Sequence, residues 1–176
     1  MKWDKDLIIV KDNFLDETVF KKIYADLDTV KFESRYGREK RGDGDKIYFD
    51  VPLSQDHSGP LALRSFLKDE FGIIVTKMKS FYLLTPKHKE PTPHHDLPFK
   101  INCIIYLKGP TFIHNGTALY ENEKKGELWD FNTLVGFKEN RMLMFSAGKM
   151  HASLQSEEGA TGRFIMSNWI NEYELE

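Results

Sequence analysis

Cysteine is almost absent from this sequence: Cys103 is the single one among 176 residues. A lone cysteine excludes an internal disulfide framework, and it makes a reducing, cytoplasmic compartment the default expectation. Because Cys103 lies in an alternating apolar stretch, we expect a buried structural thiol rather than a reactive one.

Long apolar segments are missing as well. The uncharged stretch from Ile101 to Leu107 is far shorter than the roughly 20 residues that a membrane-spanning helix needs. The N-terminus precedes only a short apolar run, Leu7 to Val10, which is not the pattern of a signal peptide. We therefore expect no membrane partner.

No charge of one sign dominates, since 25 basic residues stand against 27 acidic ones and leave a formal net charge of −2. This balance gives no electrostatic reason to expect a nucleic-acid partner. Hydrophobic residues make up 40% of the chain, as in ordinary globular proteins. Because no linker, repeat or low-complexity tract divides it, the chain is predicted to be a single domain over residues 1–176.

Helical periodicity dominates the first part of the chain, up to about residue 72. Asp16 is suited to cap a helix and Gly72 to end one. Residues 33–46 are charged and contain glycine, which favours a solvated surface loop; the alternative is a segment that covers a site and contacts its substrate. The predicted elements are a short buried strand, Leu7–Val10, and two helices, Glu17–Leu27 and Gly59–Phe71.

From Ile73 onward the pattern changes to short strands separated by glycine and proline. Asn115 and Gly116 are the residues that a tight type I′ turn favours. Helices followed by a run of strands predict an α+β domain whose core, about residues 73–171, is an antiparallel barrel or a double-sheet jelly roll. The predicted strands are Ile73–Leu84, Lys100–Leu107, Gly116–Glu121, Leu134–Phe137, Arg141–Ser146, Met150–Leu154 and Arg163–Ile170.

The segment from Pro93 to Asp96 carries the first candidate metal ligands. Side chains alternate between the two faces of an extended chain, so His94 and Asp96 project to one side while His95 projects to the other. An imidazole and a carboxylate spaced in this way can bind one metal ion as neighbouring ligands. We therefore expect His94 and Asp96 to be ligands, and His95 to be a surface residue or to support them from outside.

A third imidazole must come from elsewhere, and His151 is the best placed. It follows an apolar strand and a short turn, so it is expected to sit at the start of a further strand. Two imidazoles and one carboxylate on one face of an octahedron suit Fe(II) and leave positions for other ligands. Zinc hydrolases also use such a set, so the ligands alone leave the metal open.

Arg163 lies twelve residues after His151 (163 − 151), at the start of the last predicted strand. If these two strands form a hairpin around the glycines at 159 and 162, Arg163 falls near His151 and faces the same cavity. A guanidinium there would hold a carboxylate through two parallel hydrogen bonds. The alternative is a surface ion pair with Glu157 or Glu158.

Together these residues resemble the Fe(II)/2-oxoglutarate dioxygenases, and in particular their prolyl-4-hydroxylase-like branch. The family pattern is His-x-Asp, a long gap, a distal histidine and then a basic residue on the following strand. Here His94, Asp96, His151 and Arg163 match it, and the resemblance spans about Phe81 to Trp169. Thr117 departs from the family's Gly-Gly-x-Leu element, and the distance from His151 to Arg163 is longer than usual.

The resemblance implies further site residues and a fold. Cys103–Lys108 looks like the family's strand in which a tyrosine, here Tyr106, reaches the distal carboxylate of 2-oxoglutarate. Phe81-Tyr82-Leu83 looks like the preceding strand, whose tyrosine would line the same pocket. The implied fold is a double-stranded β-helix (a cupin-like jelly roll) with the N-terminal helices packed on one sheet.

The implied function is an oxygenase that requires Fe(II), 2-oxoglutarate and O2. It would couple the decarboxylation of 2-oxoglutarate to succinate with hydroxylation of a protein or peptide, with proline as one candidate residue. Two alternatives remain: a small-molecule oxygenase of the same chemistry, or a jelly roll with a non-catalytic metal or a hydrolytic zinc. The primary substrate and the oligomeric state cannot be read from the sequence.

Overall fold

A computed structural model of the chain describes residues 3–34, 49–85, 93–125, 128–154 and 163–176. Most of the predicted loop over 33–46 lies outside these residues, and so does the turn between 159 and 162. In order, the elements are β1 (Ile9–Lys11), α1 (Glu17–Asp26), β2 (Glu33–Ser34), β3 (Phe49–Pro52), α2 (Ser58–Phe71), β4 (Ile73–Thr85), β5 (Ile101–Lys108), the 3-10 helix η1 (Ile113–Asn115), β6 (Thr117–Lys125), β7 (Leu128–Val135), β8 (Met142–Ser146), β9 (His151–Ser153) and β10 (Arg163–Leu175).

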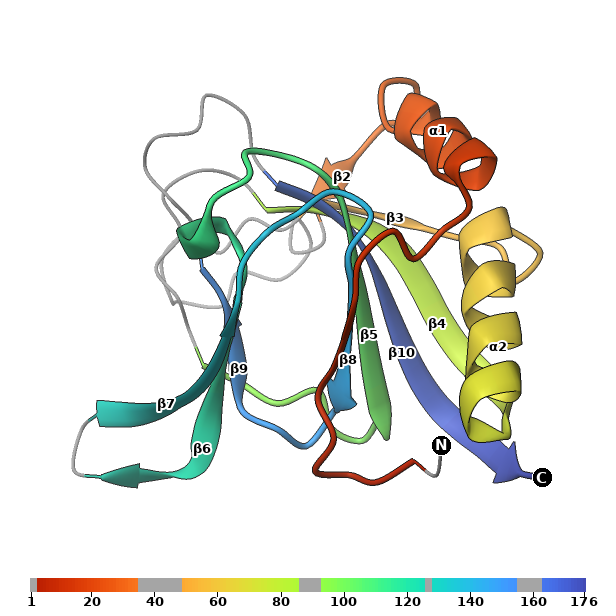
Figure 1. Cartoon of the computed structure of the whole chain (residues 1–176). Coiled ribbons are helices and arrows are strands. Elements are labelled where there is room, and N and C mark those ends of the chain that lie inside the picture. The colour runs from red at the N-terminus through yellow and green to blue at the C-terminus, as the bar shows by residue number, and fades with distance from the viewer. Residues whose placement is uncertain (1–2, 35–48, 86–92, 126–127, 155–162) are drawn as a thin grey trace.

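The strands form two facing antiparallel sheets. The major sheet has the order β1-β8-β5-β10-β4-β3-β2, and the minor sheet has the order β7-β6-β9. Both helices lie on the outer face of the major sheet, and the minor sheet lies on its other side (Figure 1). This is a double-stranded β-helix with helices packed on one sheet. Because the described strands form two separate sheets, the predicted jelly roll is confirmed and the barrel is not.

Local sequence explains where the helices begin and end. The Asp16 carboxylate accepts a hydrogen bond from the Thr18 backbone N–H and so caps α1. Gly72 ends α2 at a φ of 64°, in the left-handed region that glycine adopts without strain. Both predicted helices are therefore confirmed almost to the residue.

Two apolar clusters lie on opposite faces of the major sheet. The helix-side cluster joins Leu63 and Leu67 of α2 and Ile23 of α1 to the sheet, and it includes Cys103. The inter-sheet cluster joins residues such as Ile104 and Ile165 to Leu119 of the minor sheet. Cys103 is fully buried, and this burial raises the pKa of its thiol, which fits the predicted structural role.

Four local predictions are wrong. The strand expected at Leu7–Val10 lies at Ile9–Lys11 and is not buried, since Val10 is 45% exposed. Met150–Leu154 and Arg163–Ile170 do not form a hairpin, because β9 pairs with β6 in the minor sheet while β10 lies between β4 and β5 in the major sheet. Asn115–Gly116 is not a type I′ turn: it ends a 3-10 helix and leads from one sheet to the other, so no hairpin is closed there. The strand predicted at Leu134–Phe137 begins earlier, at Leu128, and ends at Val135.

Within the described ranges, no helix combines the length and the apolar character that crossing a membrane would require.

Leu67 of α2 is a test of the helix-side cluster, since its side chain is fully buried there. We expect Leu67→Ala to lower the free energy of unfolding by about 2–5 kcal/mol, because the substitution removes apolar contacts and leaves a cavity. Leu61, on the same helix, is 49% exposed, and Leu61→Ala should change stability by no more than about 0.5 kcal/mol. Urea unfolding of the two variants checks this; equal losses would contradict the assigned face of α2.

Candidate functional site

Two backbone hydrogen bonds join the segment around His94 to strand β9. The His94 N–H donates to the His151 carbonyl at 2.9 Å, and the His151 N–H donates back to the His94 carbonyl at 2.8 Å. Residues paired directly in this antiparallel manner point their side chains to the same face. His151 also pairs with Leu119 of β6, so His94 extends the minor sheet by one bridge. Both imidazoles therefore project together into the space between the sheets.

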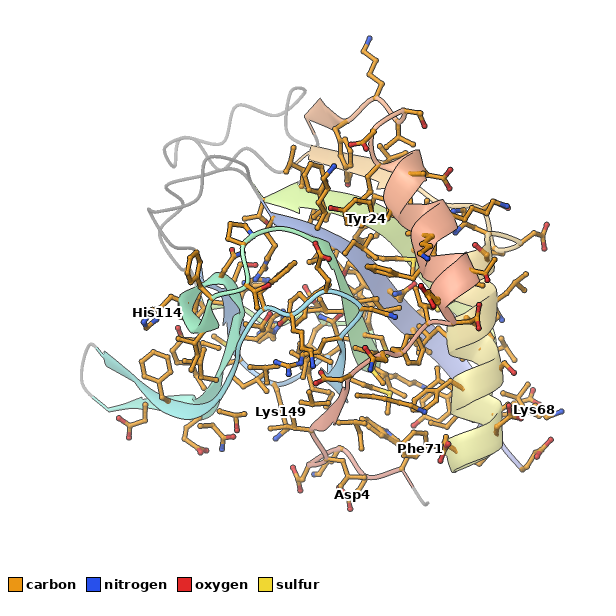
Figure 2. The ribbon with its side chains drawn as sticks, turned by 45° about the horizontal axis from the view of Figure 1, so that its top comes forward. Asp4, Tyr24, Lys68, Phe71, His114 and Lys149 are labelled. Atoms are coloured by element: carbon orange, nitrogen blue, oxygen red, sulfur yellow. The ribbon has the colours of Figure 1, made fainter. Side chains whose placement is uncertain are left out.

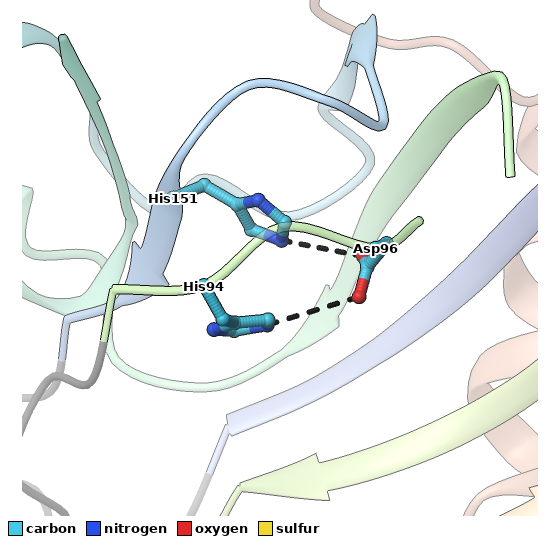
Figure 3. Close-up of side chains that lie close together, drawn as sticks. All are labelled: His94, Asp96 and His151. Atoms are coloured by element: carbon cyan, nitrogen blue, oxygen red, sulfur yellow. Dashed lines mark ion pairs between the residues drawn. The ribbon is translucent and has the colours of Figure 1, made fainter. Parts of the chain in front are cut away.

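Asp96 completes a cluster of three side chains that could hold a metal ion. Its backbone N–H donates to the Ala147 carbonyl at 2.9 Å, which anchors the end of the segment beside the turn before His151. Its carboxylate oxygens lie 3.9 Å from Nε2 of His94 and 3.3 Å from Nε2 of His151. The three side chains point toward one another (Figure 3), and one ligand atom of each lies within 4.8 Å of the others. This separation suits a single bound ion.

The His151 ring is held in an orientation suited to a metal ligand. Its Nδ1 lies 3.0 Å from the Lys149 carbonyl, to which a protonated Nδ1 donates. The tautomer that makes this bond leaves the lone pair of Nε2 facing Asp96, the arrangement found in metal-bound histidines. The Phe145 ring packs against the imidazole at a centroid distance of 4.8 Å. The donor set and its supports thus fit a divalent ion.

Asn102 of β5 belongs to this site, although no motif pointed to it. Its Nδ2 donates to Oδ2 of Asp96 at 2.5 Å. A signal was present in the sequence: Asn102 is the one amide in the apolar stretch Ile101–Leu107, and a polar residue buried in a strand needs a partner.

The cluster forms part of the lining of a cavity between the two sheets. Apolar side chains from β4, β5 and β10 form one side, and hydroxyl and amide groups are distributed along the rest. The lining residues are Leu83, His94, Asp96, Asn102, Ile104, Thr117, His151, Ser153, Ile165, Ser167 and Trp169. Two hydroxyl groups, of Thr117 and Ser153, come from the minor sheet.

Arg163 lies behind these hydroxyl groups. It is 1% exposed, so it is not a surface residue; Glu157 and Glu158 fall outside the described ranges. Its Nη1 donates to the carbonyl of Asn115, at 3.0 Å, and to that of Gly116, while Nη2 donates to the Ser153 hydroxyl. Burial lowers the pKa of the guanidinium, although an arginine remains charged under ordinary conditions. A positive charge is thereby held beside the cavity.

Tyr106 packs beside this arginine. The Arg163 guanidinium lies over its ring, with Cζ 5.6 Å from the ring centroid. The phenol donates to the Thr117 hydroxyl at 2.8 Å, and burial raises its pKa. The structure therefore groups Tyr106 and Arg163 behind the cavity lining, with Tyr106 bonded to Thr117 and Arg163 to Ser153.

Tyr82 is a correction, because the structure places it on the other face of the major sheet. Strand alternation sends Leu83 into the cavity and Tyr82 into the helix-side cluster. There the hydroxyl lies 3.0 Å from Nε2 of His57, the N-cap residue of α2, and burial raises the pKa of the phenol. The resemblance pointed to β4, but the residue of β4 that lines the cavity is Leu83, not Tyr82.

The other histidines that the structure describes, His57, His95 and His114, do not belong to the cluster. His95 is exposed, as the alternation predicts, and His114 on η1 points outward from the body of the molecule (Figure 2). His57 caps α2 by accepting from the Gly59 N–H. His88 falls outside the described residues.

Comparisons with known proteins give matches in structure. No protein-family model and no curated protein sequence matches the chain. A prolyl hydroxylase from Trichoplax adhaerens, in complex with a hypoxia inducible factor oxygen degradation domain peptide, matches with a TM-score of 0.63 at 16% identity, over 93% of this chain and 83% of that one. A prolyl-4-hydroxylase from Pseudomonas putida matches with a TM-score of 0.63 at 13% identity, over 94% and 92%.

A third match carries iron and a keto acid. The epimerase SnoN, in complex with Fe3+, alpha ketoglutarate and nogalamycin RO, matches with a TM-score of 0.62 at 12% identity, over 95% of this chain and 80% of that one. A further match is described as a 2OG-Fe(II) oxygenase family oxidoreductase from Burkholderia pseudomallei. The chain has the 2-oxoglutarate/Fe(II) oxygenase fold. At these identities the likeness shows the fold.

His94 and His95 provide a matched pair for testing the metal site on this oxygenase fold. We expect His94→Ala to weaken binding of a divalent ion by more than the roughly 10–100-fold that loss of an outer supporting group costs, since a direct ligand is removed. His95→Ala removes the exposed neighbour and should leave the affinity within about twofold. Calorimetric titration with Mn2+ measures both. Equal effects in the two variants would reject the strand-based assignment.

Proposed function

We propose that this chain is an Fe(II)- and 2-oxoglutarate-dependent oxygenase. Fe(II) would be held by His94, Asp96 and His151, and 2-oxoglutarate would be converted to succinate and CO2 as a primary substrate is oxidised. One observation supports this above all: a metal-binding triad and a buried arginine are associated with the same inter-sheet cavity. A hydrolytic zinc site would account for the triad but not for the arginine.

The donor groups of Arg163 argue for a carboxylate ligand. A guanidinium has five N–H groups, and the contacts of Nη1 and Nη2 described above use three of them. Nε is buried and has no hydrogen-bond partner among the described residues. A carboxylate at this end of the cavity would meet the Ser153 and Thr117 hydroxyls and the remaining donors of the guanidinium. We assign this role to Arg163, with Tyr106 supporting it through Thr117.

The protein's own contribution is binding, orientation and exclusion of water. When bound, Fe(II) supplies the oxidising chemistry that uses O2 and 2-oxoglutarate to modify a carbon of the primary substrate. His151 and Asp96 are the inner, shielded ligands, while His94 is 44% exposed at the outer side of the cluster. Leu83, Ile104 and Ile165 give the cavity an apolar wall between its two ends.

The primary substrate is proposed to be a protein or peptide, with hydroxylation, of a prolyl residue among others, as the reaction. The exposure of His94 supports this choice, because it leaves the metal end of the cavity open to a side chain presented by a larger molecule. The matched prolyl hydroxylase holds a peptide, which agrees with this reading. A small-molecule oxygenase is the second candidate, and the SnoN complex with nogalamycin RO supports it. The single-domain organisation and the cytoplasmic location stay predictions.

Turnover of 2-oxoglutarate tests the chemistry directly. The full chain, loaded anaerobically with Fe(II) and then given O2, 2-oxoglutarate and ascorbate as the reductant, is expected to form succinate slowly even without a primary substrate. His151→Ala should abolish this, because it removes a shielded ligand. Succinate is measured by mass spectrometry. Equal succinate formation by wild type and His151→Ala would argue against the proposal, as would its absence in wild type with a confirmed full complement of iron.

Arg163→Lys tests the carboxylate end while keeping the positive charge. Hydrogen bonds to charged groups contribute about 1.5–3 kcal/mol, so we expect the KM for 2-oxoglutarate to rise about 10–100-fold with metal affinity unchanged. Tyr82→Phe is the control: it removes a hydroxyl on the opposite face of the sheet and should leave this KM as it is. If Tyr82→Phe raised the KM as much as Arg163→Lys, the two faces would be wrongly assigned.

A further inference from the structure

Asn102 occupies a position between the metal-binding cluster and the cavity. It lies on β5, directly opposite Trp169 of β10 and Phe145 of β8, and it is 1% exposed. Both Asn102 and Trp169 line the cavity. The side chain is thus held at the boundary between the ligand Asp96 and the space in which other molecules would bind.

The amide N–H side of Asn102 restrains the Asp96 carboxylate. Nδ2 donates to Oδ2 at 2.5 Å, and the Asp96 main chain is held separately by Ala147. A carboxylate can rotate about its Cβ–Cγ bond, which would carry its oxygens away from the two imidazoles. The hydrogen bond from Asn102 opposes that rotation. Reversing the amide would set its carbonyl against the carboxylate, two acceptors facing each other, so the orientation is determined by Asp96.

Among the described residues, none donates a hydrogen bond to the carbonyl oxygen of the same amide. Oδ1 of Asn102 is buried and makes no hydrogen bond with any residue in the described parts of the chain. Buried acceptors are costly when they have no partner, so this atom is suited to a donor brought by an occupant of the cavity. The dianion of 2-oxoglutarate carries two carboxylates and a ketone, which are all acceptors. The donor must therefore come from water or from the primary substrate.

We propose that Asn102 is a positioning residue for the metal ligand Asp96 and that its carbonyl faces an occupant other than 2-oxoglutarate. The first part concerns metal binding and requires only that His94, Asp96 and His151 bind a metal ion. The second part rests on the proposed function. Asn102 acts through Asp96 rather than by contact with the metal, so its removal should weaken metal binding without abolishing it.

Cobalt titration of the metal-free full chain tests the first part. We expect Asn102→Leu, which is close in volume, and Asn102→Ser, which is smaller, each to weaken Co2+ binding about 10–100-fold and to change the visible absorption of the bound Co2+. Ser167→Ala is the control, since it removes a buried hydroxyl of the neighbouring strand β10 from the same cavity and leaves the Asn102–Asp96 hydrogen bond in place. Its Co2+ affinity should stay within about twofold of wild type. A purely structural role for Asn102 would lower the unfolding temperature of the metal-free chain but leave the Co2+ spectrum unchanged.

The kinetics of 2-oxoglutarate test the second part. At saturating Fe(II), Asn102→Ser should show the wild-type KM for 2-oxoglutarate in succinate formation, within about threefold. Wild-type Co2+ affinity and spectrum in a folded Asn102→Ser chain would overturn the positioning role. A raised KM with unchanged metal binding would make Asn102 a 2-oxoglutarate contact instead. If the wild-type chain forms no succinate, the proposed function fails, while the Co2+ titration still decides the role of Asn102.

Discussion

The reciprocal hydrogen bonds between the His94 and His151 main chains are the interaction on which the site depends. They join a segment that precedes β5 to a strand near the end of the chain, and they do so with backbone atoms alone. The separation of the two imidazoles is therefore set by the geometry of a sheet rather than by flexible side chains. The anchor from Asp96 to Ala147 then brings the carboxylate to the same place. His151 opens β9 and His94 is bridged to it, so sheet pairing fixes the main chain of both residues.

Side chains alternate along the strands, so one face of the major sheet lines the cavity and the other packs against the helices. On β10, Arg163, Ile165, Ser167 and Trp169 share the cavity face, while Met166 and Ile170 face the helices. On β5, Asn102, Ile104 and Tyr106 face inward, while Cys103 and Ile105 belong to the helix-side cluster. Helices α1 and α2 therefore stabilise the sheet from behind and leave its other face free for polar chemistry. The Tyr82–His57 contact belongs to that supporting layer.

Local signals predicted much of the fold and of the metal site. Asp16 and Gly72 mark helix ends through their own backbone and side-chain preferences, and the period of two in a strand selected His94 and Asp96 over His95. Arg163 was expected beside the cavity because of a hairpin with the strand of His151, and that hairpin does not form. Arg163 lies there because β9 and β10 belong to two sheets that face each other. Such a contact cannot be inferred from the spacing of residues along the chain. Tyr82 shows a second limit: the face of a strand cannot be chosen when both faces are apolar, since helices cover one and the cavity the other. Asn102 was missed because its partner is known only once β5 and the ligand segment are side by side.

Gly116 shows that the main chain beside Arg163 is tightly packed. A Cβ atom there would lie 1.9 Å from the Val135 carbonyl oxygen, so two backbone segments are already in contact. The carbonyl groups of Asn115 and Gly116 are also the acceptors that hold Arg163. The guanidinium is thus held in part by main-chain acceptors, which are fixed by the fold. Under the proposed function, this main-chain contact would limit how far Arg163 can move to admit a dicarboxylic acid one methylene longer than 2-oxoglutarate.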